Sequence, residues 1–83
     1  MQSAILRRVL ELTEPTDYFA VAGVEFSDGR YIVRCVALQT VDLRQVLFPV
    51  RKEFGVPVDV FFIQNSYSFR KQLIAKIHSE RAL

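Results

Sequence analysis

The spacing of apolar residues predicts a helix followed by two strands at the start of the chain. Apolar residues recur at helical spacing from Ser3, which is suited to cap a helix, to about Thr13. Pro15 ends this helix, because proline disfavours helical backbone at the residue before it. The next two runs, Tyr18 to Phe26 and Arg30 to Gln39, are rich in β-branched and aromatic residues and predict strands.

Asp28 and Gly29 separate the two strands and predict a tight hairpin, because both residues of such a turn must accept a positive φ. In regular strands this turn places Phe26 opposite Tyr31 and, farther along, Ala22 opposite Cys35. One face of the hairpin then carries small residues in its middle. The opposite face carries a mostly apolar set: Phe19, Val21, Glu25, Ile32, Arg34, Val36 and Leu38.

A second helix is expected from Thr40 or Asp42 to Phe54, with Gly55 as its C-terminal cap. Pro49 lies inside this stretch and removes one backbone donor. The segment is therefore either a kinked helix or two short helices, of which the second begins at Pro49.

A third strand, Val56 to Gln64, and a last helix, Tyr67 to about Arg81, complete the chain, and Asn65 or Ser66 caps the helix. One face of this helix carries an apolar stripe, which is expected to be buried: Phe69, Leu73, Ile74 and Ile77. The element order is α-β-β-α-β-α within a single small domain that spans residues 1–83. This order predicts an α+β fold, with a three-stranded, mostly antiparallel sheet and helices packed mainly on one face.

The second face of this sheet is too apolar to meet water. If the helices cover the first face, the second face is an exposed apolar surface, and such surfaces mark interaction sites. We expect it to bind a protein partner, most simply a second copy in a two-fold dimer. The alternative is a monomer whose helices cover both faces. The predicted interface consists of residues from all three strands: Phe19, Val21, Ile32, Arg34, Val36, Leu38, Phe61 and Ile63.

Composition narrows the class of protein further. Hydrophobic residues make up 51% of the chain, which excludes disorder. No apolar run approaches the roughly 18 residues of a membrane span. A secretory signal has its basic residues before its apolar stretch, whereas here Arg7 and Arg8 follow Ile5 and Leu6. We therefore expect a cytoplasmic protein without a membrane partner. A single cysteine, Cys35, and a single histidine, His78, cannot form an internal disulfide or a four-ligand zinc site, and we expect no metal or cofactor.

Catalytic motifs are missing, and no catalytic residue is predicted. Asp59 and Glu25 are the carboxylates that an enzyme would use. The simpler interpretation is that Asp59 pairs with Arg34 across the sheet, in a charged cluster with Glu25 that fixes the register of an interface. His78 is interpreted as an exposed residue near a helix C-terminus, and Cys35 as a buried structural residue.

A different class of function is suggested at the start of the last helix. Ser66, Tyr67, Arg70 and Lys71 combine free backbone N–H groups, two cations and an aromatic ring, which suits a phosphate or a nucleic-acid backbone. The net charge of +2 is too low to indicate a nucleic-acid binder by itself. A second small basic patch lies on the middle helix: Arg51 and Lys52, with Arg44 nearby.

The element order, and a helix that closes on Phe54-Gly55-Val56-Pro57-Val58 before the third strand, resemble the type II KH and BolA-like arrangement over residues 1–64. The GXXG loop of RNA-binding KH domains falls between two short helices, where this chain has Gln45 to Val50. The histidine typical of BolA proteins has no counterpart in the middle helix or third strand. No functional residue is therefore carried over from either family.

The sequence thus favours a small, non-enzymatic interaction module that works as a homo-oligomer or as a partner-binding adaptor. The first alternative is a protein that binds phosphate or a nucleic-acid backbone through its basic helix residues in a KH-like fold. An enzyme that uses Asp59 and Glu25 comes third.

Overall fold

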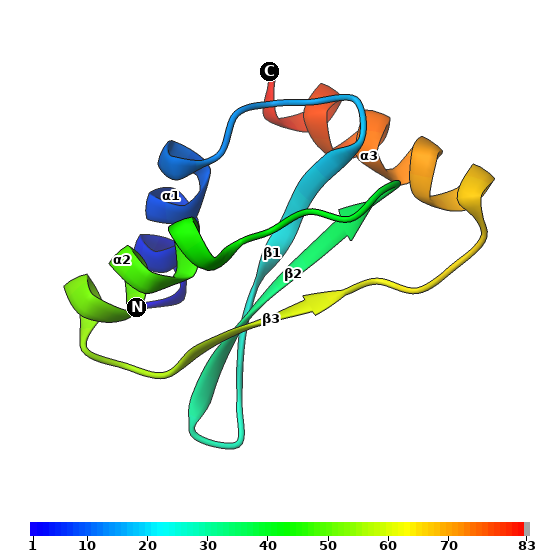
Figure 1. Cartoon of the computed structure of the whole chain (residues 1–83). Coiled ribbons are helices and arrows are strands. Elements are labelled where there is room, and N and C mark those ends of the chain that lie inside the picture. The colour runs from blue at the N-terminus through cyan, green and yellow to red at the C-terminus, as the bar shows by residue number, and fades with distance from the viewer. Residues whose placement is uncertain (83) are drawn as a thin grey trace.

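The structure is a computed structural model that describes residues 1–82. Its elements follow the predicted α-β-β-α-β-α order, and Figure 1 shows how they are arranged. In chain order they are α1 (Gln2–Leu12), β1 (Phe19–Ser27), β2 (Arg30–Ala37), α2 (Arg44–Phe54), β3 (Val58–Phe62) and α3 (Tyr67–Arg81).

The three strands form one sheet in the order β1-β2-β3, in which β1 and β2 are antiparallel and β2 and β3 are parallel. Helices α1 and α2 contact each other on one side of the sheet. Helix α3 crosses the opposite face at the end farthest from the hairpin turn (Figure 1). The predicted α+β fold is therefore confirmed, with two helices on the first face and one on the second.

The hairpin turn has the predicted geometry. Asp28 and Gly29 both have a positive φ, 52° and 77°, as a two-residue turn that matches the twist of the strands requires. The predicted register also holds from Phe26 opposite Tyr31 up to Gly23 opposite Arg34. The turn therefore sets the pairing for the half of the hairpin that lies nearest to it.

Beyond Gly23 the predicted pairing is wrong, because β1 contains an extra residue. The register shifts between Val21 and Gly23, so Cys35 lies opposite Val21 instead of Ala22. A bulge of this kind leaves one residue unpaired and exchanges the faces of every residue beyond it. Phe19 and Val21 are consequently buried on the first face, whereas Ala20 turns to the second.

The first two helices differ from prediction at their starts. Helix α1 begins at Gln2, so Ser3 lies inside the helix and does not cap it. Helix α2 begins at Arg44 and continues through Pro49 to Phe54, so the two-helix alternative is wrong. The loss of one backbone bond is tolerated because packing of the apolar face provides most of the stability of a helix in a protein, and α2 buries three residues: Val46, Leu47 and Val50.

The caps at the ends of the later elements agree with prediction. Gly55 closes α2 in the left-handed conformation, with φ 64°. Ser66 caps α3 by accepting a hydrogen bond from the backbone N–H of Phe69 at 3.2 Å. Strand β3 is shorter than predicted, although the carbonyl of Pro57 and the N–H of Ile63 extend its bonding to β2 by one residue at each end.

The two faces of the sheet bury separate cores. The core of the first face joins α1 and α2 to the sheet through residues such as Ile5, Val9, Val33 and Val50. The second core is smaller and lies beneath α3: Ala20, Val36, Ile74 and Ile77. Because α3 crosses only one end of the second face, the end toward the hairpin turn is left without a helix.

Candidate interaction surface

The predicted interface residues separate into three groups in the structure. Phe19 and Val21 lie in the core of the first face, as a result of the bulge. Val36 is fully buried under α3, and Leu38 is partly buried against the same core. The remaining four lie on the second face: Ile32, Arg34 and Phe61 lie beyond the edge of α3, and Ile63 lies at that edge, where it packs against the same core as Leu38.

Phe61 is the most exposed of these four residues, with 49% of its surface accessible. The guanidinium carbon of Arg34 lies 5.3 Å from the centre of its ring, a distance at which a cation is attracted to an aromatic face. Arg34 and Phe61 are neighbours in the β2–β3 register, so the parallel pairing brings the two side chains together.

One flank of α3 extends this surface. Ile74 and Ile77 face the sheet, and His78 lines a hollow with Tyr18 and Leu38 on the flank beyond the strand ends. By helical spacing, Phe69 and Leu73 lie on the other flank, toward the hairpin turn. Phe69 is 45% exposed, so it does not join the buried face predicted for this helix. We call the following set the open patch, in which Ile63 and Leu73 form the margin that packs against the core beneath α3: Ile32, Arg34, Phe61, Ile63, Phe69 and Leu73.

The charges around the open patch are arranged in ion pairs. Arg34 lies 3.4 Å from Glu25, which agrees with two members of the predicted cluster. The predicted pair of Asp59 with Arg34 is wrong, because Asp59 is bound by Arg30 at 2.8 Å and approached by Arg51 at 3.5 Å. Asp59 lies opposite Ile32, so Arg30 and Arg34 are both diagonal neighbours of Asp59. Arg34 instead lies over Phe61.

The predicted anion site uses its groups internally. Arg70 donates to the backbone carbonyls of Asn65 at 3.0 Å and Ala37 at 2.6 Å, and so fastens α3 to the end of β2. Ser66 accepts from the N–H of Phe69, one of the helix N-terminal donors that an anion would need. Tyr67 and Lys71 are exposed. The hydrogen bonds of Arg70 to backbone carbonyls therefore explain why this one of the two cations lies near the start of the helix.

The second basic patch is also partly neutralised. Arg51 donates to the carbonyl of Val58 at 2.7 Å, in addition to its approach to Asp59. The Arg44 guanidinium forms hydrogen bonds with Asp42, which lower the pKa of that carboxyl from 3.8 to about 2 and raise the pKa of Arg44. Lys52 is exposed.

Cys35 lies where the sequence places it, buried among the residues of the first core. Burial raises the pKa of its thiol to about 12, which keeps the sulfur in its unreactive protonated form near neutral pH. Within residues 1–82, no three His, Cys, Asp or Glu side chains lie close enough together to hold a metal ion.

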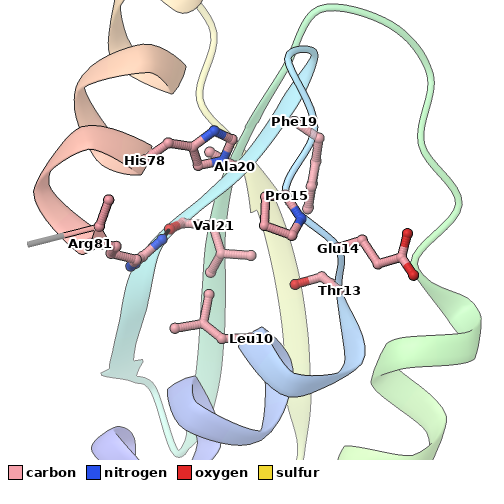
Figure 2. A pocket seen from close by; sticks show the side chains of 10 residues that line it. Leu10, Thr13, Glu14, Pro15, Phe19, Ala20, Val21, His78 and Arg81 are labelled. Carbon is pink, nitrogen blue, oxygen red and sulfur yellow. Dashed lines mark hydrogen bonds between the residues drawn. The ribbon is translucent and has the colours of Figure 1, made fainter.

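An apolar cavity lies beside β1, between the end of α1 and the end of α3 (Figure 2). Its volume is about 460 Å³, and its lining includes Leu10, Phe19 and Val21, with His78 and Arg81 on the α3 side. The Arg81 guanidinium donates to the carbonyl of Val21, and burial lowers its pKa. The polar groups in this cavity thus include an arginine that holds α3 against β1.

No family model, curated protein or solved structure matches this chain. In the part of the chain that the structure describes, no helix has the length and apolar character needed to cross a membrane.

Sequence reasoning missed the contribution of α3 to the surface. Phe69 was expected in the buried stripe of that helix with Leu73, Ile74 and Ile77, and the helical period alone supports that assignment. Phe69 lies at the margin of this stripe, and the rotational orientation of α3 about its own axis decides whether its side chain is buried. Arg70 and Arg81 influence that rotation, because each binds a backbone carbonyl of the sheet.

Proposed function

We propose that this chain is a small, non-enzymatic protein-interaction module that acts as a homodimer and associates through the open patch. The exposure of Phe61 is the observation that carries the proposal. An aromatic ring in a strand, 49% accessible and beside a half-buried isoleucine, Ile32, gains free energy when a partner removes it from water. Aromatic residues and arginine are also the residues that most often dominate binding energy at interfaces.

The charges around the patch favour a second copy of the chain as the partner. The patch and its margin carry both signs, with Arg30, Arg34 and Arg51 beside Glu25 and Asp59. A surface of one sign would repel its own copy, whereas a mixed surface can be complementary to itself about a two-fold axis. A chain of 83 residues also buries a limited share of its surface alone, and association adds to its stability.

The proposal is tested by sedimentation equilibrium over a wide range of protein concentrations. The wild-type chain is expected to change from 9.6 kDa to twice that mass as its concentration rises. Phe61→Ser is expected to weaken dimer formation about 30-fold, as loss of a central interface aromatic does. Because Phe61 is exposed, the variant should keep its circular dichroism spectrum and unfold cooperatively.

Phe48→Ser is the matched control. Phe48 is 69% exposed, more than Phe61, but it lies on α2, away from the second face. It should dimerise like the wild type. A wild-type chain that stays at 9.6 kDa at every concentration, or equal weakening by the two substitutions, would contradict the proposal. Salt-sensitive binding to RNA by a monomeric chain would instead favour the nucleic-acid alternative.

A further inference from the structure

The two edges of the sheet differ in how their backbone groups are used. On the β1 edge, Gln2 donates to the carbonyl of Val24 at 3.2 Å, and Arg81 donates to the carbonyls of Val21 and Ala22. These bonds come from α1 and α3, so both helices protect this edge from pairing with another strand.

The β3 edge is protected only near its ends, where Arg51 donates to the carbonyl of Val58 at 2.7 Å and the Gln64 side chain donates to the carbonyl of Phe62 at 3.4 Å. In a parallel pair, successive residues direct their backbone groups alternately toward and away from the neighbouring strand. The carbonyl of Pro57 and the N–H of Ile63 are bonded to β2, so by this alternation Val58, Val60 and Phe62 direct theirs outward. Arg51 binds the carbonyl of Val58, which confirms this direction. The N–H and carbonyl of Val60, at the centre of the strand, receive no such cover from α2.

The space beside Val60 is open. A hollow of about 470 Å³ lies between α2 and the β3 edge, and its lining includes Leu47, Arg51, Val60 and Phe61. The backbone of a further strand would lie beside this hollow. An exposed edge of this kind is a template for pairing, and natural proteins rarely leave one open without a purpose.

We propose that β3 pairs with β3 of a second copy, antiparallel about a two-fold axis at Val60, and extends the sheet from three strands to six. This inference rests on the proposed function, and it places Phe61, the most exposed residue of the open patch, at the seam of that dimer. Val60 exchanges both backbone hydrogen bonds with Val60 of the copy, and Val58 lies opposite Phe62. The carbonyl of Val58 has two lone pairs, so it can accept from the copy while Arg51 remains bound.

This register gives complementary side-chain contacts on the second face. Asp59 lies opposite Phe61 of the copy, and Phe61 becomes a diagonal neighbour of its own equivalent, within reach of an aromatic contact. Arg34 lies over Phe61 in each chain, so each Asp59 approaches the Arg34 of the other chain. The two-fold axis forms this contact twice: the Asp59 carboxylate of each chain lies beside the Phe61 ring of the other chain, over which Arg34 lies.

The test measures amide hydrogen exchange by NMR on the full chain, at a dilute and a concentrated sample whose masses are known from sedimentation. The N–H of Val60 is expected to exchange at least about tenfold more slowly in the dimer than in the monomer. The N–H groups of Asp59 and Phe61 face β2 in both states and serve as internal controls. Their exchange should change far less.

The outcomes separate the two proposals. A dimer with a protected Val60 amide supports the edge pairing. A dimer in which Val60 exchanges equally fast at both concentrations overturns the edge pairing and leaves the homodimer standing. A chain that is monomeric throughout overturns both proposals.

A pair of variants gives an independent measurement. Val60→Pro removes the outward N–H, and proline is tolerated on an edge strand at such a position. It should keep the fold and dimerise at least about tenfold more weakly, whereas Val60→Ala keeps the N–H and should dimerise within about threefold of the wild type. Equal dimerisation of two folded variants would refute the pairing, and if Val60→Pro does not fold, the exchange measurement decides.

Discussion

The second face of the sheet is covered at one end and open at the other, although both ends carry apolar residues. At the covered end, Val36 is fully buried and α3 supplies Ile74 and Ile77 above it. At the open end, Phe61 is half exposed and lies under Arg34. The difference arises because the chain has only fifteen residues of helix for this face. One short helix that crosses the strands covers one end, and the apolar residues at the other end remain available to a partner.

The largest expected effect comes from truncating the covered end. Ile74→Ala should lower the free energy of unfolding by about 2–5 kcal/mol, because it leaves a cavity in a small core. Phe61→Ala, which removes a larger side chain at the open end, should cost less than about 1 kcal/mol in dilute samples. Urea unfolding of both variants measures the difference. Equal losses would show that the two ends contribute alike to the folded monomer.

Arg81→Met is expected to have an intermediate effect. The substitution removes the hydrogen bonds to Val21 and Ala22 but keeps most of the apolar stem, so the free energy of unfolding should fall by about 1–2 kcal/mol. Lys76→Met, on an exposed position of the same helix, is the control and should change stability by less than about 0.5 kcal/mol. The same urea titrations apply. If the two variants are equally stable, the hydrogen bonds of Arg81 do not stabilise the packing of α3 on the sheet.

Deletion of Ala22 is expected to have the smallest effect, although deletions inside strands usually unfold small proteins. Gly23 would follow Val21 directly, and Val21 and Gly23 would keep their present partners, Cys35 and Arg34, in a regular ladder. The stability should change by about 1 kcal/mol or less, and the NMR spectrum should retain the shifts of the covered end.

Deletion of Ala20 is the matched control for this experiment. It moves Phe19 opposite Val36, beneath α3, and takes its ring out of the first core. It should therefore cost more than about 3 kcal/mol. If deletion of Ala22 lowered stability as much as deletion of Ala20, the bulge would stabilise the fold in some way other than by placing Phe19 and Val21 on the first face.

Much of the fold follows from local rules that can be read along the chain. Asp28 and Gly29 determine the hairpin because positive φ at two successive positions suits few residues. Gly55 ends α2 for the same conformational reason, and Ser66 begins α3 because its hydroxyl satisfies a nearby backbone N–H. These features depend on residues within one turn of each other, so the sequence alone predicts them.

The candidate surface could be predicted only in part. Ile32, Arg34, Phe61 and Ile63 lie on the second face as expected, because they belong to stretches where the alternation of strands is regular. The partner of Asp59 could not be predicted, since two arginines lie at equivalent diagonal positions and the stacking of Arg34 on Phe61 decides between them.

What the sequence determined by itself is therefore the order of elements, the hairpin and the caps, all of which depend on backbone preferences of neighbouring residues. Tertiary structure alone decided the bulge at Ala22, the position of α3 on the second face and the open edge of β3. Each of these balances contacts between segments far apart in the chain. The bulge buries Phe19 and Val21 under α1 and α2 at the expense of one regular backbone pair, and no local pattern records that balance.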